Sequence, residues 1–249
     1  MLIINNWCGR TGNNILQLIR CIWVAIYYRH NKIHFIHNLF ITNMISFPNI
    51  QNNNVIIKDN FFNINSYNLP DIPLYKMKEL FQIYLKPIIK LDLNKNINKT
   101  DIYIHLRGGD IFSHNPHSAY VQPPLSYYKN IISKYDKCIM VYEDTKNVCV
   151  HPLINYKEKV NTFHKSLQED IEHLCHCEQL AIGFGTFGLM IYIMNNNLKK
   201  LYIPDFYYDE LPNRDFGKNI HIEVVSLPNY IKVREWKNTL EQRRLMLTY

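Results

Sequence analysis

Apolar residues along the chain fall into two series of predicted strands and helices. In the first, an apolar run at residues 2–5 leads through two glycines into residues 14–28, where apolar positions recur at helical spacing. Residues 33–36 have the composition of a strand. This strand–turn–helix–strand order predicts a βαβ unit at the start of the chain. We expect residues 37–75, rich in Asn and Pro, to be irregular, and residues 77–85 to be helical.

The second series follows a polar stretch at residues 90–100. Its predicted strands are residues 102–106, 138–142, 179–182 and 200–203, and its predicted helices are residues 126–134, 166–177, 187–194 and 230–247. Ser166 and Glu169 form a capping-box pattern. We therefore predict an α/β protein with two Rossmann-like domains around a cleft, residues 1–95 and 96–249. The terminal helix is expected to pack back on the first domain.

Charge and cysteine content narrow the class of protein. The net charge of the 249 residues is +7, yet Lys and Arg are scattered, which favours a small anionic ligand over a nucleic acid. A basic nucleic-acid-binding protein stays the weaker alternative. The six cysteines have no regular spacing, and the apolar stretch at residues 15–28 is interrupted by Arg20 and too short for a membrane span. We expect a soluble, cytoplasmic protein without a membrane span.

The first candidate motif is the glycine turn that contains Gly9, Arg10, Gly12 and Asn13. Glycines between a strand and a helix let the backbone turn tightly and approach a ligand. The helix that follows favours an anion at its N-terminus. The alternative is an ordinary βα turn in which Asn13 caps the helix.

The second candidate motif ends a predicted strand with His105, Arg107 and Asp110, with two glycines between the last two. His105 and Arg107 share one face because side chains alternate along a strand. Arg107 offers a bidentate fork to phosphate oxygens, and Asp110 orients it or shapes the turn. The alternative is a surface salt bridge at a strand end, which would require neither His105 nor the glycines.

The third candidate motif, Gly183 to Gly188, follows a predicted strand and opens a helix. It matches the dinucleotide fingerprint G-x-G-x-x-G, with Asp205 near the expected distance downstream. An NAD-dependent oxidoreductase is therefore an alternative function. The motif lies late in the chain, however, whereas the fingerprint belongs to the first βα turn of its fold.

The three motifs, in this order, resemble those of the fucosyltransferase superfamily, which includes the α1,2-, α1,6- and protein O-fucosyltransferases. The first motif is similar to the family's G-R/x-x-G-N-x opening, and the second to its H-x-R-x-G-D element. The third, taken with Asp170 and Cys175, is similar to the element that ends in Ser/Thr-Phe. The strand that ends in Glu143 and Asp144 also has a counterpart in that family.

The resemblance implies a GT-B-like fold and an inverting glycosyltransferase. It implies that fucose is moved from GDP-fucose to a glycan or another hydroxyl acceptor. Arg107 would hold the donor's β-phosphate, and Arg10 and Asn13 would reach the donor from the first domain. The remaining residues assigned to the donor are Gly12, His105, Asp110, Asp144, Gly185, Thr186 and Phe187.

The sequence also predicts a reaction without a metal or a bound cofactor. Metal-using glycosyltransferases commonly hold their cation with Asp-x-Asp, and the chain contains no such element. Arginine and helix N-termini would then stabilise the leaving diphosphate. The cluster formed by His173, Cys175, His176 and Cys177 is more consistent with core packing than with zinc, because helical positions two apart face different ways.

Overall fold

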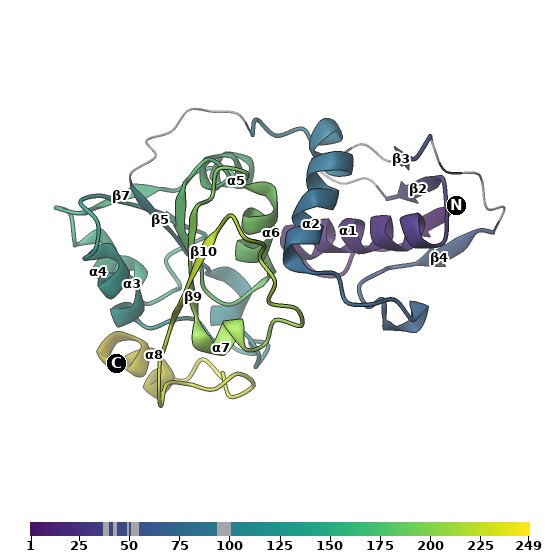
Figure 1. The fold of residues 1–249 in the computed structure, drawn as a ribbon. Helices are drawn as coiled ribbons and strands as arrows, with labels where there is room; N and C mark the ends of the chain where they lie inside the picture. The colour runs from purple at the N-terminus through teal and green to yellow at the C-terminus, as the bar shows by residue number, and fades with distance from the viewer. Residues whose placement is uncertain (37–39, 42–43, 49, 51–54, 94–100) are drawn as a thin grey trace. The chain divides into compact units, whose positions relative to one another are not determined.

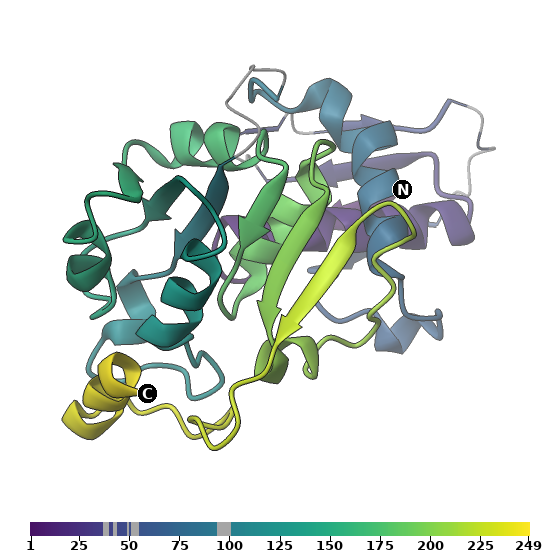
Figure 2. The same cartoon turned by 60° about the vertical axis from the view of Figure 1, so that its left-hand side comes forward.

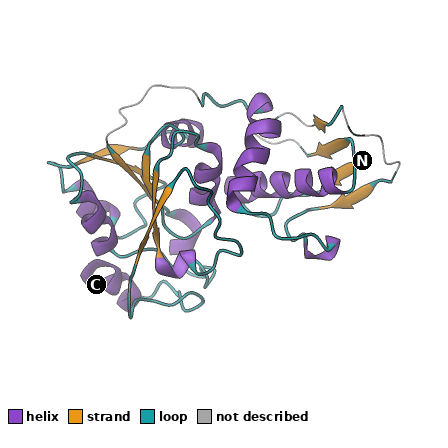
Figure 3. Ribbon diagram, in the orientation of Figure 1, coloured by secondary structure: helices purple, strands orange, loops and turns teal. Residues whose placement is uncertain are grey.

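The computed structural model describes residues 1–36, 40–41, 44–48, 50, 55–93 and 101–249 (Figures 1 and 3). Its strands are β1 (Leu2–Ile4), β2 (Lys32–Phe35), β3 (Met44–Ser46), β4 (Ile57–Asp59), β5 (Ile102–Leu106), β6 (Cys138–Tyr142), β7 (Val160–Phe163), β8 (Gln179–Ala181), β9 (Lys200–Pro204) and β10 (His221–Val225). Its α-helices are α1 (Thr11–Tyr27), α2 (Leu74–Leu80), α3 (Leu125–Ile132), α4 (Val150–Ile154), α5 (Leu167–Leu174), α6 (Thr186–Met194), α7 (Asp205–Tyr208) and α8 (Leu240–Thr248).

Short helical turns complete the described elements. A π-helical segment, Phe81–Leu85, continues α2, and 3-10 turns occupy Asn65–Tyr67, Lys86–Ile88 and Gly109–Phe112. The last of these turns begins two residues after Arg107, which directly follows β5, and it contains Gly109 and Asp110 of the second sequence motif.

The chain forms two compact units. The first is made of Met1–Asp92, Leu189–Met194 and Pro212–Gly217, and the second of Leu93–Gly188, Asn195–Leu211 and Lys218–Tyr249. The predicted boundary between residues 95 and 96 lies outside the described residues. The two later segments that belong to the first unit were not anticipated from the sequence.

The first unit is built on a four-stranded sheet with the order β3-β2-β1-β4. β1 pairs in parallel with β2 and β4, whereas β3 is antiparallel to β2. Between β1 and β2 runs α1, which buries Ile15, Leu18 and Ile22. These side chains lie on one face because they are three and four residues apart. The predicted βαβ unit is therefore confirmed.

The second unit is built on a parallel six-stranded sheet with the order β10-β9-β8-β5-β6-β7. The chain starts in the middle with β5, moves outward through β6 and β7, returns to the other side of β5 with β8, and continues through β9 and β10. This is the strand order of the doubly wound nucleotide-binding fold. Figure 2 shows the twisted sheet with helices packed against it. The fold class is thus α/β with parallel strands.

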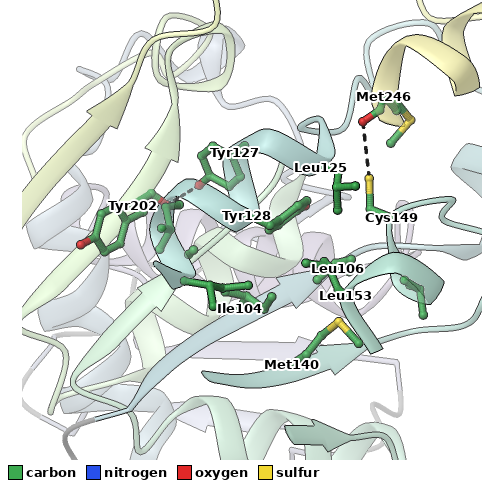
Figure 4. Close-up of a cluster of buried hydrophobic side chains, with 14 of the residues drawn as sticks. Ile104, Leu106, Leu125, Tyr127, Tyr128, Met140, Cys149, Leu153, Tyr202 and Met246 are labelled. Atoms are coloured by element: carbon green, nitrogen blue, oxygen red, sulfur yellow. Dashed lines mark hydrogen bonds between the residues drawn. The ribbon is translucent and has the colours of Figure 1, made fainter. Parts of the chain in front are cut away.

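The core of the second unit lies between the sheet and the helices α3, α4 and α8. Ile104, Leu106 and Met140 from the strands meet Tyr127 and Tyr128 of α3 in this core (Figure 4). The Tyr127 hydroxyl donates to the carbonyl oxygens of Ile182 (2.9 Å) and Tyr202 (3.1 Å), so a buried polar group is satisfied within the sheet. On the opposite face of β5, Tyr103 contacts His173 of α5 at a ring-centroid distance of 5.3 Å.

Several element predictions were wrong in detail. Residues 37–75 were expected to be irregular, but they contain β3 and β4. The edge strands β7 and β10 were not predicted at all, because neither forms a continuous buried run of apolar residues. The helix expected at residues 230–247 is shorter: α8 begins only at Leu240, after Thr239 caps it through a capping box with Gln242.

The position of α8 is defined within the second unit. Met246 is fully buried in the core, and its carbonyl oxygen lies 3.9 Å from the Cys149 Sγ (Figure 4). The helix therefore packs on the second unit. The packing of α8 on the first domain, expected from the sequence, stays a prediction.

Candidate functional site

The strand order of the second unit places Arg107 and the third glycine motif side by side. β5 and β8 are neighbours, and the chain leaves them in opposite directions. In open α/β sheets, ligands bind at this point, beyond the carboxyl ends of the two strands. Arg107 directly follows β5, and Gly183 to Gly188 follow β8. A Cβ atom added to Gly185 would lie 2.5 Å from Arg107 Nη1, so the guanidinium packs directly on this glycine.

Arg107 is held on two further sides. Its Cζ lies 4.5 Å from the centroid of the Tyr120 ring, which is a cation–π contact. Its Nη2 lies 3.2 Å from Asp110 Oδ1. The Arg107 side chain is only 12% exposed, whereas that of Asp110 is 55% exposed. The guanidinium is thus largely enclosed, while its carboxylate partner faces solvent.

Gly185 is positioned for this contact by its backbone. Its φ of +134° is strained for any residue with a side chain, and its carbonyl oxygen accepts a 2.8 Å hydrogen bond from the buried Tyr207 hydroxyl. α6 begins at the next residue, Thr186. The positive end of the helix dipole therefore lies beside the Arg107 guanidinium. Asp110 neutralises one side of this guanidinium, and the helix N-terminus adds a second feature that attracts an anion, so the arrangement suits an anionic ligand.

In the turn after β5, the backbone amides face carboxylates of the protein itself. The Gly108 amide donates to Glu143 Oε2 (3.2 Å), and the Gly109 amide donates to Asp144 Oδ2 (3.0 Å). A Cβ on Gly108 would lie 2.2 Å from Asp144 Oδ1, so the glycine makes room for this carboxylate. The buried Asn147 completes the contacts, because its Nδ2 donates to the Arg107 carbonyl oxygen at 2.9 Å. Carboxylates at the end of β6 therefore occupy the amides of this turn.

His105 connects the two turns. Its ring stacks on Phe187 with a centroid distance of 4.6 Å, and only 8% of the residue is exposed. Burial, reinforced by the charge of Arg107, lowers the pKa of His105 to about 3. The imidazole is therefore neutral at pH 7. His105 contacts Phe187 and Arg107 contacts Gly185, so the two side chains meet neighbouring residues of the same turn and helix start. Their expected position on one face of β5 stays a prediction.

The other features of the dinucleotide-like motif are used inside the protein. A Cβ on Gly183 would lie 2.5 Å from Gln122 Oε1, and one on Gly188 would lie 2.8 Å from Ile182 Cβ. Asp205 begins α7 instead of lying free at a strand end. Its Oδ2 accepts hydrogen bonds from Ser226 Oγ (3.0 Å) and from the Leu227 amide (2.9 Å). Contacts within the second unit therefore account for the two glycines and for Asp205, and no dinucleotide is needed to explain their presence.

The first motif lies in the first unit, at the start of α1. Gly9 has a φ of +72°, and a Cβ there would lie 2.1 Å from Asn13 Nδ2. Asn13 Oδ1 is buried and accepts no hydrogen bond from the described residues. Arg10 precedes the helix and is exposed, whereas Gly12 is buried inside it. These residues form one turn, and their expected contact with the donor stays a prediction.

Gln17 gives this turn its shape. The fully buried side chain accepts from the Cys8 amide at 2.9 Å and donates to the Asn60 carbonyl oxygen at 2.7 Å. It thereby ties α1 both to the turn before it and to the segment after β4. This role is structural, and Gln17 was not singled out from the sequence.

Sequence reasoning also missed four residues around Arg107: Tyr120, Gln122, Asn147 and Tyr207. None belongs to a short motif with a mechanism of its own. Each is recognisable only once the strand order is known, because each contacts a turn that is distant in the sequence. The signal that could have drawn attention to Gln122 is weak: it is a polar residue with apolar neighbours. Asn147 follows a polar stretch and carries no such signal.

The candidate zinc cluster has ordinary packing roles. His173 stacks on Phe163 at 3.9 Å, and the Cys177 thiol donates to the Leu174 carbonyl oxygen at 3.1 Å. Within the described ranges, no group of three or more His, Cys, Asp or Glu side chains is arranged to hold a metal ion. None of the helices described there combines the length and apolar character that crossing a membrane requires.

Comparison with known proteins adds little to this geometry. No protein-family model and no curated protein sequence matches the chain. Among solved structures, the chain is similar to the E. coli ADP-heptose lps heptosyltransferase II, with 10% sequence identity and a TM-score of 0.33. The match covers 60% of this chain and 46% of the heptosyltransferase, so the chain spans less than half of that protein. A likeness at this level identifies neither a family nor an activity.

Proposed function

We propose that the chain is a glycosyltransferase that binds the diphosphate of a nucleotide-sugar donor at the carboxyl edge of the second sheet. The observation that carries this proposal is the Arg107 guanidinium packed on Gly185 beside the N-terminus of α6. Arginine offers phosphate oxygens a planar fork, and a helix N-terminus offers backbone amides and a favourable dipole. The order of the three sequence motifs, which resembles that of fucosyltransferases, makes GDP-fucose the proposed donor.

In the proposed reaction, the bond between the anomeric carbon and the β-phosphate oxygen breaks. The oxygen of the acceptor hydroxyl attacks from the opposite face of the sugar, which inverts the anomeric centre, and the hydroxyl proton passes to water or to the departing diphosphate. Negative charge develops on the departing diphosphate, and Arg107 stabilises it. A fixed cation at this position acts on the transition state more than on the ground state, which is the condition for catalysis.

The remaining roles follow from this assignment. Thr186 and Gly185 would present backbone amides to the phosphates, and Phe187, backed by His105, would border the donor. The resemblance of the first motif also assigns Arg10 and Asn13 to the donor, and this assignment stays a prediction. A glycan or another hydroxyl compound is the proposed acceptor.

Two observations stand against the dinucleotide alternative. The G-x-G-x-x-G segment follows β8, the fourth strand of the doubly wound order, whereas the fingerprint belongs after the first strand. After the first strand, β5, the amides of Gly108 and Gly109 already bind carboxylates. A pyrophosphate placed there would meet negative charge. For the nucleic-acid alternative, no specific observation goes beyond the net charge of +7.

A ligand panel separates these functions. Thermal unfolding is measured with GDP-fucose, GDP, UDP-sugars and NAD, each at a concentration far above the expected dissociation constant. A ligand that binds the native state at about one hundred times its dissociation constant stabilises it by about 2.7 kcal/mol. We expect stabilisation by GDP-fucose and GDP and none by NAD. Stabilisation by NAD alone would contradict the proposal, and steeply salt-dependent binding to DNA or RNA would support the third alternative.

A second experiment tests the role of metal ions. Because arginine and a helix N-terminus are proposed to stabilise the diphosphate, transfer or donor hydrolysis is expected to persist in excess EDTA. The measurement compares initial rates before and after chelation. Complete loss of activity, restored by manganese or magnesium, would show that a cation carries the role assigned to Arg107.

A further inference from the structure

We propose that Tyr120 is a positioning residue that holds the Arg107 guanidinium in one orientation against the turn between β8 and α6. The inference rests on the proposed function and adds the part of the chain that gives Arg107 its geometry. Tyr120 lies in the connection between β5 and α3, far from the glycine motif in the sequence. Its ring faces Arg107, with 4.5 Å between the ring centroid and Arg107 Cζ.

Tyr120 holds Arg107 from a more sheltered position than Asp110 does. The pair with Asp110 joins residues three apart, and the Asp110 side chain is 55% exposed. Exposed pairs of this kind contribute little, and salt screens them further. The Tyr120 ring is partly buried, and the Arg107 side chain is 12% exposed. A cation–π contact is stronger where water is largely excluded.

The position of Tyr120 is itself fixed by a strap, defined here as residues 117–122. The Tyr120 amide donates to the His117 carbonyl oxygen at 3.0 Å, and the Tyr120 ring contacts Phe184 edge-on at 6.2 Å. The buried Gln122 Nε2 donates to the Phe184 carbonyl oxygen at 2.9 Å. The strap is therefore bonded to the same turn on which the guanidinium packs, so the ring, the turn and the cation form one assembly.

This arrangement has a consequence for binding. An arginine side chain has several rotatable bonds, and ordering it when a ligand arrives reduces affinity. A guanidinium already held between an aromatic ring and a glycine has lost that freedom before binding. The structure thus assigns the ring of Tyr120, and not its hydroxyl, to the positioning of Arg107.

The test compares Tyr120→Leu, which removes the ring, with Tyr120→Phe, which keeps it. Tyr120→Met provides a second ring-less variant, and circular dichroism checks folding. Tyr156→Leu serves as the control. Tyr156 lies before the amino end of β7, whereas Arg107 follows the carboxyl end of β5, so the two residues lie at opposite ends of the strands. Binding of GDP and of inorganic pyrophosphate is measured by calorimetry. We expect the ring-less variants to bind both probes about 3- to 30-fold more weakly, and the Phe and control variants to stay within about twofold of the wild type.

A second readout needs no ligand. Phenylglyoxal modifies accessible arginines, and peptide mass spectrometry gives the rate at Arg107. We expect faster modification of Arg107 in Tyr120→Leu and an unchanged rate in Tyr120→Phe. Equal behaviour of the Leu and Phe variants in both measurements would overturn the inference. If the wild type binds neither GDP nor pyrophosphate, the proposed function fails by itself, and the phenylglyoxal rates still decide whether Tyr120 holds Arg107.

Discussion

Two glycine-containing turns at the same edge of the second sheet have opposite electrostatic surroundings. After β5, the amides of Gly108 and Gly109 donate to the carboxylates of Glu143 and Asp144. After β8, Gly185 is packed against a guanidinium at the start of a helix. The first turn is neutralised within the protein, whereas the second collects positive charge.

This difference shows that glycine content does not identify a phosphate site. Both turns have glycines that give the backbone room for a close approach. What distinguishes them is the group that approaches: a carboxylate at the first turn and an arginine at the second. An anion is therefore expected at the β8–α6 turn and excluded from the β5 turn. The following experiments test this contrast.

The largest expected effect comes from removing the positive charge at the second turn. Arg107→Ala is predicted to reduce the transfer rate ~100–1,000-fold, or by about 2.7–4 kcal/mol of transition-state stabilisation. Arg107→Lys should not restore it, because a point charge lacks the planar fork. Steady-state kinetics and circular dichroism measure activity and folding. Near-normal turnover of Arg107→Ala, combined with an inactive Asp110→Asn or Glu143→Gln variant, would mean that a carboxylate carries the chemistry instead.

The next effect is a pH dependence that arises at His105, between the two turns. The unfolded imidazole titrates near 6.5, whereas burial first and Arg107 second lower the folded pKa to about 3. Between these two pKa values, His105 binds a proton in the unfolded state but not in the folded state. The free energy of unfolding therefore falls as the pH decreases through this range. At pH 4 the loss is roughly 3 kcal/mol. Urea unfolding of His105→Phe at pH 7 and pH 4 should show a correspondingly smaller loss, and an equal loss in both proteins would contradict the assignment.

A smaller effect is expected at the neutralised turn. Asp144→Ala removes the acceptor of the Gly109 amide and of the Lys146 amide, which donates to Asp144 Oδ1 at 2.9 Å. Hydrogen bonds to charged groups contribute about 1.5–3 kcal/mol, so the free energy of unfolding should fall by about 2 kcal/mol. Asp144→Asn keeps one acceptor oxygen and should lose less. If denaturant unfolding shows no change for either variant, the carboxylate does not hold the turn.

The smallest effect is expected at the N-terminus of α5, a helix start that is not proposed to bind a ligand. Ser166 caps α5 through a capping box with Glu169. Ser166→Ala is expected to lower the free energy of unfolding by about 1 kcal/mol, without changing the affinity for GDP. Thr239→Ala, which removes the equivalent cap of α8, is the matched variant. A loss of GDP affinity in Ser166→Ala would mean that the ligand site extends beyond the β8–α6 turn.

Local sequence patterns predicted the buried elements well. The strands β5 and β6 were predicted with the bounds that the structure has, and the capping box at Ser166 is present. These features depend on a few consecutive residues, so the local sequence pattern is enough to predict them. The edge strands β7 and β10 escaped prediction because their partly exposed residues do not form the apolar run of a buried strand.

The surroundings of Arg107 depend on the tertiary structure. Its contacts with Gly185 and Tyr120 require that β8 return to the side of β5, and no local pattern specifies which strands become neighbours. The same holds for the carboxylates of Glu143 and Asp144, whose proximity to the glycine turn follows from the pairing of β5 with β6. The sequence by itself determined which residues can bind an anion. The strand order decided which of the two glycine turns is neutralised by carboxylates and which faces the arginine, because charges act through space and not along the chain.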